Sequence, residues 1–70
     1  MADEYYITIN GERHDFEGSR TLQEVVLGLN LEPERVAVEL NRAIVKRPLW
    51  DSTPVEAGAQ LEIVQFVGGG

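Results

Sequence analysis

The sequence has no cysteine and a single histidine, and these two shortages remove most of the usual side-chain chemistry. Without cysteine there is no disulfide, no cysteine-zinc site and no iron–sulfur ligation, and His14 alone cannot build a histidine metal cage. Nucleophilic catalysis needs an activated nucleophile beside a base, and His14, next to Asp15 in an expected strand, completes no triad. We therefore interpret His14 as a half-exposed strand residue and expect no enzyme.

Basic residues and long apolar runs are also scarce. Six Lys and Arg residues stand against twelve Asp and Glu residues, which gives a formal net charge of −6. Nucleic-acid affinity comes largely from basic side chains that neutralise phosphates, so this charge argues against such a partner. No apolar run approaches the length of a membrane span, and the N-terminus is acidic where a signal peptide would be basic. We expect a cytoplasmic protein with no nucleic-acid or membrane partner.

The length of 70 residues, with 43% hydrophobic residues, is enough for one compact domain. A core of this size supplies only about 3–5 kcal/mol of stability, and neither disulfides nor a metal site can add to it. Stability must therefore come from packing and from a well-paired sheet. We expect one domain over residues 1–67, followed by a flexible glycine tail over residues 68–70.

Two segments have the pattern of a β-hairpin. In the first, a β-rich run is followed by Asn10-Gly11, the dipeptide that best tolerates the positive φ angles of a type I′ turn. In the second, apolar residues alternate with period two before a tight turn at Asn41-Arg42. The expected strands are residues 5–9, 12–16, 36–40 and 43–45.

A helix is expected between the two hairpins. Thr21 and Glu24 have the spacing of a capping box, and Asn30 is a suitable left-handed stop. Between them the apolar residues fall at i, i+3, i+4 and i+7, which places them on one face of about two turns. This stripe consists of Leu22, Val25, Val26 and Leu29, and we expect it to face Ile7, Ile9, Val38, Leu61 or Ile63.

The remainder of the chain predicts an irregular stretch and a last strand. Two prolines break any regular element, so Leu49, Trp50 and Val55 are expected to cap the core from irregular structure. Gly58 marks the last turn. The run 61–67 is apolar at both parities, which predicts a central strand covered on both faces. Together these elements predict an α+β roll, a mixed sheet of about five strands packed on one helix.

The chain ends in Gly68-Gly69-Gly70. No helix follows these glycines, so they cannot form a phosphate-binding loop. Residues without Cβ atoms can extend into a narrow slot and leave a terminal carbonyl open to attack. A flexible chain end would have the same composition. The position directly after a central apolar strand favours a tail that projects from a rigid base.

Docking of a partner to this tail would need further residues. Val64, Phe66 and Val67 lie where the strand meets the tail, and an exposed apolar residue there would anchor a partner. The alternative for Phe66 is packing under the helix, and the sequence leaves both open. The basic cluster of Arg42, Lys46 and Arg47 also has two interpretations. It is either exposed charge beside a turn or a docking site for a partner.

Several of these motifs occur together in one known family. They are Ile9-Asn10-Gly11-Glu12, Thr21-Leu22, Val36-Ala37-Val38-Glu39-Leu40-Asn41, Ile44-Val45 with Arg47 and Trp50, and Val67-Gly68-Gly69-Gly70. Through them the chain resembles ThiS, the sulfur-carrier family of thiamine biosynthesis, over nearly its whole length. One departure is Gly58-Ala59, where relatives often carry Gly-Asp.

The resemblance implies a ubiquitin-like β-grasp fold and a carrier cycle. A partner resembling ubiquitin-activating (E1) enzymes would use ATP and magnesium to adenylate the carboxylate of Gly70. Sulfur derived from cysteine, through a sulfurtransferase or cysteine desulfurase, would displace AMP. The resulting thiocarboxylate would deliver sulfur to thiazole synthase. Gly69 matches the family's diglycine, and Gly68 extends it. Because the partner enzymes perform each chemical step, the protein would be a co-substrate that binds no cofactor itself.

Three alternatives remain open from the sequence. The small subunit of molybdopterin synthase uses the same terminal chemistry for a different product. A ubiquitin-like modifier would be joined to target lysines, although Lys46 is the only lysine of this chain and offers few acceptors for self-conjugation. A binding module with incidental glycines is the third.

Overall fold

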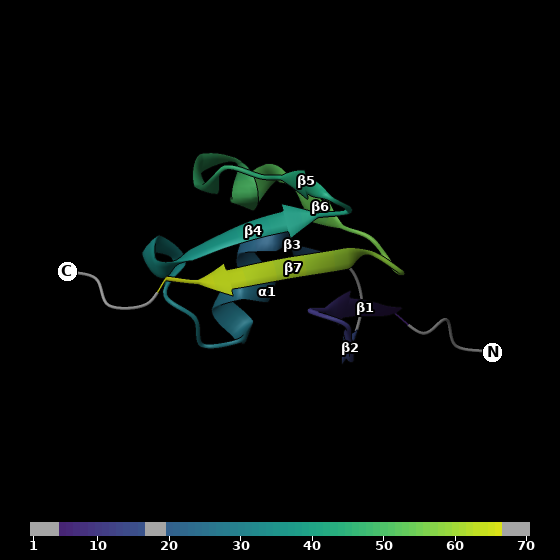
Figure 1. Cartoon of the computed structure of the whole chain (residues 1–70). Coiled ribbons are helices and arrows are strands. Elements are labelled where there is room, and N and C mark those ends of the chain that lie inside the picture. The colour runs from purple at the N-terminus through teal and green to yellow at the C-terminus, as the bar shows by residue number, and fades with distance from the viewer. Residues whose placement is uncertain (1–4, 17–19, 67–70) are drawn as a thin grey trace.

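The computed structural model describes residues 5–16 and 20–66, which form a five-stranded mixed sheet with a helix on one face (Figure 1). The strand order is β2-β1-β7-β4-β5, with β1 parallel to β7 and the other neighbours antiparallel. The expected α+β architecture is confirmed. The elements are β1 (Tyr5–Ile9), β2 (Glu12–Phe16), β3 (Arg20–Thr21), α1 (Leu22–Gly28), η1 (Pro33–Arg35), β4 (Val36–Leu40), β5 (Ala43–Ile44), η2 (Arg47–Ser52), β6 (Pro54–Val55) and β7 (Gln60–Gln65), where η denotes a 3₁₀-helix.

Both hairpin turns adopt the predicted left-handed backbone. Asn10 and Gly11 have φ angles of 52° and 86°, and Asn41 and Arg42 have φ angles of 52° and 73°. Two successive positive φ angles are the mark of a type I′ turn, which matches the twist of the flanking strands. The return strand of the second hairpin ends at Ile44, one residue earlier than expected.

The capping box that starts α1 is present in full. The Thr21 amide donates to Glu24 Oε1 at 2.9 Å, and the Glu24 amide donates to Thr21 Oγ1 at 3.1 Å. These two bonds satisfy backbone donors that a helix start leaves unpaired. Asn30, with φ of 62°, follows the end of the helix as predicted.

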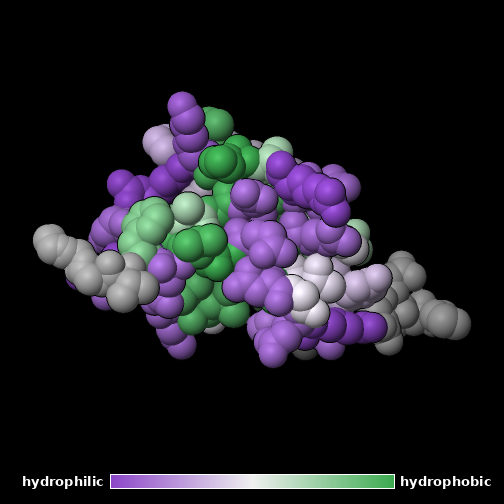
Figure 2. Space-filling view, viewed as in Figure 1, coloured by the Kyte–Doolittle hydropathy of each residue, from purple (hydrophilic) through white to green (hydrophobic). Residues whose placement is uncertain are grey.

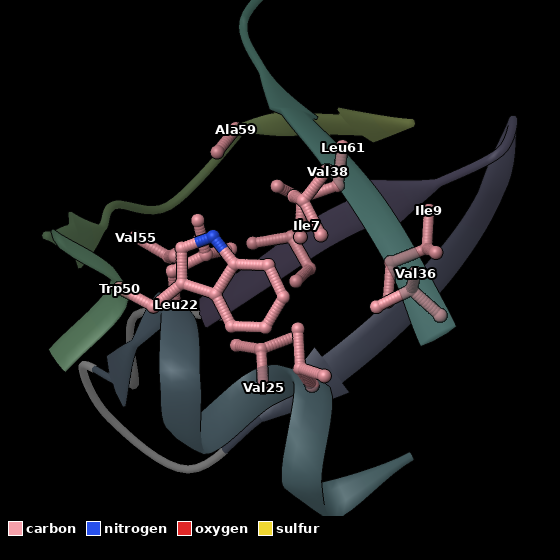
Figure 3. Close-up of a cluster of buried hydrophobic side chains, with 11 residues drawn as sticks. Ile7, Ile9, Leu22, Val25, Val36, Val38, Trp50, Val55, Ala59 and Leu61 are labelled. Atoms are coloured by element: carbon pink, nitrogen blue, oxygen red, sulfur yellow. The ribbon is translucent and has the colours of Figure 1, made fainter. Parts of the chain in front are cut away.

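The core lies between α1 and one face of the sheet. The Trp50 ring is fully buried among residues of the helix and the strands (Figure 3). Its Nε1 donates to the Val45 carbonyl at 2.8 Å, which gives the buried indole its polar partner. Leu29 and Ile63 pack at the margin and are only partly buried. The core residues are Ile7, Ile9, Leu22, Val25, Val26, Val36, Val38, Trp50, Val55, Ala59 and Leu61.

The segment expected to be irregular is more ordered than the sequence predicted. Residues Arg47–Ser52 form η2, and Pro54–Val55 form β6, which pairs with β3 in a separate small sheet. Trp50 and Val55 are buried as predicted, but Leu49 is exposed and does not cap the core. A 3₁₀-helix turns about 120° per residue, so adjacent side chains cannot face the core together.

The last strand is central, as predicted, but it is not covered on both faces. In β7 only Leu61 is buried, while Val64 is exposed. Successive strand side chains point to opposite faces, and α1 covers one of them. The expectation of two covered faces was wrong, and the apolar residues of the second parity remain on the surface.

Candidate functional site

The predicted site residues lie at and beyond the end of β7. Val67, Gly68, Gly69 and Gly70 lie outside the described residues, so their roles and the predicted flexibility of the tail stay predictions. Phe66 is described and exposed, and its amide donates to the Arg35 carbonyl at 2.8 Å. Of the two alternatives for Phe66, packing under the helix is therefore wrong.

The strand that leads to the tail is held at two points by asparagine side chains. Asn41 accepts the Gln60 amide through Oδ1 at 2.9 Å and donates its own amide to the Gln60 carbonyl at 2.7 Å. Asn10 binds Ile63 in the same strand through its side-chain amide. Each asparagine is the first turn residue of a hairpin, so both hairpins are tied to β7. The two hairpins therefore fix the position of β7 in the sheet at its first residue and at Ile63.

The face of the sheet opposite α1 carries an apolar patch, which we call the outer-face patch and define as Ala37, Ile44, Val64 and Phe66. Ala37 lies opposite Val64 across the β4–β7 pair. Ile44, Val64 and Phe66 are 73%, 60% and 55% exposed. Figure 2 shows apolar residues gathered over β4, β5 and β7 between hydrophilic ones. Exposed apolar residues grouped in this way mark interaction surfaces.

Charged residues border the patch. Glu39 and Glu62 lie directly opposite each other across β4 and β7, next to the Ala37 and Val64 pair. Like charges in opposed positions destabilise a sheet, so this pair is not explained by stability. The basic residues Lys46 and Arg47 are exposed on the segment that follows β5.

A groove of about 290 Å³ opens at the edge of the sheet beside the end of β7. It lies between the start of β4 and the segment that leaves β5, and Ala37, Ile44 and Phe66 belong both to it and to the outer-face patch. Its lining is mainly apolar, with two basic residues and one acidic residue. The lining residues are Pro33, Glu34, Val36, Ala37, Val38, Ile44, Val45, Lys46, Arg47, Trp50 and Phe66.

The described residues also bear on metal ligation, on His14 and on membrane crossing. Among residues 5–16 and 20–66, no group of three His, Asp or Glu side chains is placed to hold a metal ion. His14 lies half-exposed on β2, as predicted, with Nε2 3.8 Å from Glu12 Oε1. No described helix is long and apolar enough to cross a bilayer.

Sequence reasoning missed Ile44 and Ala37 as surface residues of the site. The signal was available in the alternation of β4, where Val36 and Val38 share one parity and Ala37 has the other. The alternation does not predict which residue of another strand lies opposite each position. Only the pairing of Ala37 with Val64 and of Glu39 with Ile44 brings these residues onto one face.

Comparison with known proteins identifies similar sequences and structures. A sequence profile of the ThiS family matches residues 7–70. A crystal structure of a thiamine biosynthesis protein (ThiS) from Geobacter metallireducens has a TM-score of 0.80 and 34% identity, covering 93% of this chain and 99% of that one. This likeness confirms the expected β-grasp fold.

Two curated relatives differ greatly in length. The chain is 42% identical over 64 residues to a thiazole synthase from Magnetococcus marinus, which covers 91% of this chain but 20% of that protein. It is 39% identical over 64 residues to the uncharacterized protein ycf40 of Pyropia yezoensis, covering 91% of this chain and 90% of that protein. The chain thus spans about a fifth of the length of the thiazole synthase that it matches.

Proposed function

The chain belongs to the ThiS family of sulfur-carrier proteins, and on that premise we propose that it carries sulfur as a thiocarboxylate at Gly70. The sulfur would be used to form the thiazole ring of thiamine. The protein acts as a co-substrate in the cytoplasm and leaves catalysis to its partners. These are an E1-like adenylating enzyme that uses ATP and magnesium, a sulfurtransferase or cysteine desulfurase as sulfur source, and thiazole synthase.

The chemistry consists of two displacements at the Gly70 carboxyl group. A carboxylate oxygen attacks the α-phosphorus of ATP, pyrophosphate leaves, and an acyl adenylate forms. A sulfur nucleophile at the oxidation level of sulfide then attacks the carbonyl carbon. A C–S bond forms as the C–O bond to AMP breaks, and a proton is lost from sulfur. Both steps develop charge that needs donors and a metal ion, which an enzyme supplies and this acidic domain lacks.

The observation that best supports this proposal is the placement of Phe66. It is the last described residue after the central strand, it is tied to Arg35 by a backbone hydrogen bond, and it is exposed within the outer-face patch. A partner that binds the patch would therefore hold the chain at a fixed point four residues before Gly70. The relatives named thiazole synthase support the thiamine pathway over that of molybdopterin.

The test is conversion of the purified chain by a cognate adenylating enzyme with ATP, magnesium and sodium sulfide, read by intact mass as replacement of one oxygen by sulfur. Two variants accompany the wild type, one lacking Gly70 and one extended beyond it. Deletion moves the carboxylate by about 3.3–3.6 Å along an extended tail, and extension replaces it with an amide. A misplacement of about 1 Å at a reacting centre can cost about a hundredfold in rate, so both variants should fail.

The matched control is the stability of the same variants, measured by urea denaturation. Chain ends outside a packed core contribute little, so both variants should unfold at the wild-type midpoint. Equal thiocarboxylate formation by the extended variant would overturn the carrier chemistry. Conversion of the wild type alone would support it.

A further inference from the structure

The free edge of β4 and the groove beside it suggest a specific docking mode. We propose that the groove binds an extended segment of thiazole synthase, which adds a strand to β4 at Val36 and presents a carboxylate to Lys46 and Arg47. This inference rests on the proposed function and adds to it the mode by which one partner is recognised.

The backbone of β4 shows where a strand can be added. In an antiparallel strand, the amide and carbonyl of one residue point to the same side, and successive residues alternate. The Arg35 carbonyl accepts from the Phe66 amide, and the Asn41 amide donates to the Gln60 carbonyl. The backbone amides and carbonyls of the odd-numbered β4 residues therefore point toward β7. The Val38 carbonyl accepts from the Val45 amide, so the backbone amides and carbonyls of the even-numbered residues point away from β7. The amide and carbonyl of Val36 therefore point toward the groove.

The neighbouring strand ends before it reaches this position. The β4–β5 ladder consists of Leu40 with Ala43 and Glu39 with Ile44, and Val45 adds one further bond. Within residues 5–16 and 20–66, no strand pairs with Val36 on this side. A strand edge with unpaired donors and acceptors is a template for an added strand, in which main-chain bonds give affinity and alternate side-chain pockets give specificity.

The lining of the groove indicates the side chains of the segment. Val45, Trp50 and Phe66 provide an apolar wall for one side chain. Lys46 and Arg47 outnumber Glu34 in the lining, although the whole chain has a net charge of −6. This local reversal of charge favours an acidic residue in the partner, because opposed charges steer and orient an interface.

Two observations favour thiazole synthase as the source of the segment. The groove shares Ala37, Ile44 and Phe66 with the outer-face patch, so one partner can cover both while it holds the end of β7. Relatives named thiazole synthase contain a stretch similar to this chain within a much longer protein. In those relatives, the contact between the stretch similar to this chain and the rest of the protein would form within one polypeptide.

The experiment uses purified thiazole synthase and measures its dissociation constant for the full chain by calorimetry. A chemically synthesised chain with an N-methyl group on Val36 lacks the donor that faces the groove. Its control carries the N-methyl group on Asp15, whose amide points away from β1 at the outer edge of the described sheet. A second pair compares Lys46→Glu/Arg47→Glu with Arg42→Glu, an exposed cation outside the groove. Circular dichroism and urea denaturation establish that each variant is folded.

We expect both groove variants to bind about tenfold more weakly or worse, because the N-methyl variant loses one interface hydrogen bond and the charge-reversed variant repels the partner's carboxylate. Both controls should bind within about twofold of wild type. In the ¹⁵N-labelled wild type, the Val36 amide and the Trp50 indole N–H signals should shift on binding. Wild-type affinity in both groove variants, or equal weakening in groove and control variants, would overturn the assignment.

Sulfur loading separates this inference from the proposed function. The wild type and both control variants should accept sulfur from the adenylating enzyme and sulfide. Failure of the wild type to accept sulfur overturns the carrier function, and the docking assignment with it. Groove variants that lose adenylation but still bind thiazole synthase normally would overturn the choice of partner.

Discussion

The side-chain amide of Asn10 forms two hydrogen bonds with the backbone of Ile63, 53 residues later in the sequence. Asn10 Nδ2 donates to the Ile63 carbonyl at 3.1 Å, and Asn10 Oδ1 accepts the Ile63 amide at 2.8 Å. The parallel pairing of β1 with β7 consists of Thr8 with Gln60 and Ile9 with Leu61, and it ends there. Where the backbone of β1 turns away into its hairpin, the side chain of Asn10 thus extends the ladder by one step and fixes β7 in register.

Replacement of Asn10 should destabilise the fold through two separable effects. Asn10→Gly keeps the positive φ angle but loses both side-chain bonds, and should cost about 1–3 kcal/mol. Asn10→Ala loses the same bonds and keeps a Cβ in left-handed backbone without the polar side chain that makes asparagine tolerant of it, so it should cost about 1–2 kcal/mol more than Asn10→Gly. Urea denaturation followed by Trp50 fluorescence measures both. A loss below about 0.5 kcal/mol for Asn10→Gly would show that water replaces the side chain equally well.

Two leucines of α1 provide a matched test of the core. Leu22 is fully buried and Leu27 is half exposed on the same helix. Leu22→Ala should cost about 2–5 kcal/mol, because a cavity remains beneath the sheet. Leu27→Ala should change the free energy of unfolding by less than about 0.5 kcal/mol. For Leu29→Ala we expect a value between these two, since Leu29 is partly buried. Equal effects at Leu22 and Leu27 would contradict the assignment of the helix face.

The hydrogen bond of Trp50 predicts a cost for its removal. Trp50→Phe leaves the Val45 carbonyl without its donor, at a cost of about 1–3 kcal/mol from the unpaired acceptor, and loses apolar contacts besides. Tyr5→Phe is the comparison, because the buried Tyr5 hydroxyl has no partner among the described residues and its loss should be neutral or stabilising. Thermal unfolding followed by circular dichroism measures both, since Trp50 fluorescence is lost. A destabilised Tyr5→Phe together with an unaffected Trp50→Phe would refute this reading.

The outer-face patch predicts loss of function without loss of stability. Phe66→Ala and Ile44→Asp should each reduce the specificity constant for thiocarboxylate formation by about tenfold or more, since central apolar anchors dominate interface energies. Their unfolding midpoints should stay near wild type because both side chains are exposed. Leu27→Ala, on the helix side of the sheet, is the control for a removed surface apolar group. Unchanged kinetics in both patch variants would exclude the patch from the contact with the adenylating enzyme.

The opposed carboxylates predict a stabilising substitution. Glu62→Gln removes the repulsion with Glu39 and should raise the free energy of unfolding by about 0.2–1 kcal/mol. Added salt should narrow the difference, since exposed charges are screened. A gain that persists unchanged at high salt would indicate a cause other than repulsion.

Local signals in the sequence determined much of the fold. Asn10-Gly11 and Asn41-Arg42 specify their turns because few residues tolerate positive φ angles, and the structure confirms both turns. Thr21 and Glu24 specify the start of α1, because their side chains reach backbone groups only three residues away. These features depend on contacts between residues close together in the sequence, so they can be predicted without knowing the tertiary structure.

Tertiary structure decided which residues are exposed around the site. Phe66, Ile44 and Val64 are as apolar as core residues, and from sequence alone Phe66 had two possible environments. A single helix buries one face of the sheet, and strand pairing places these residues on the other face. The free edge at Val36 depends on how early β5 departs from β4, and the bond from Asn10 to Ile63 joins the two ends of the chain. Such properties arise from pairing between distant segments, and periodicity within one segment cannot specify its partner.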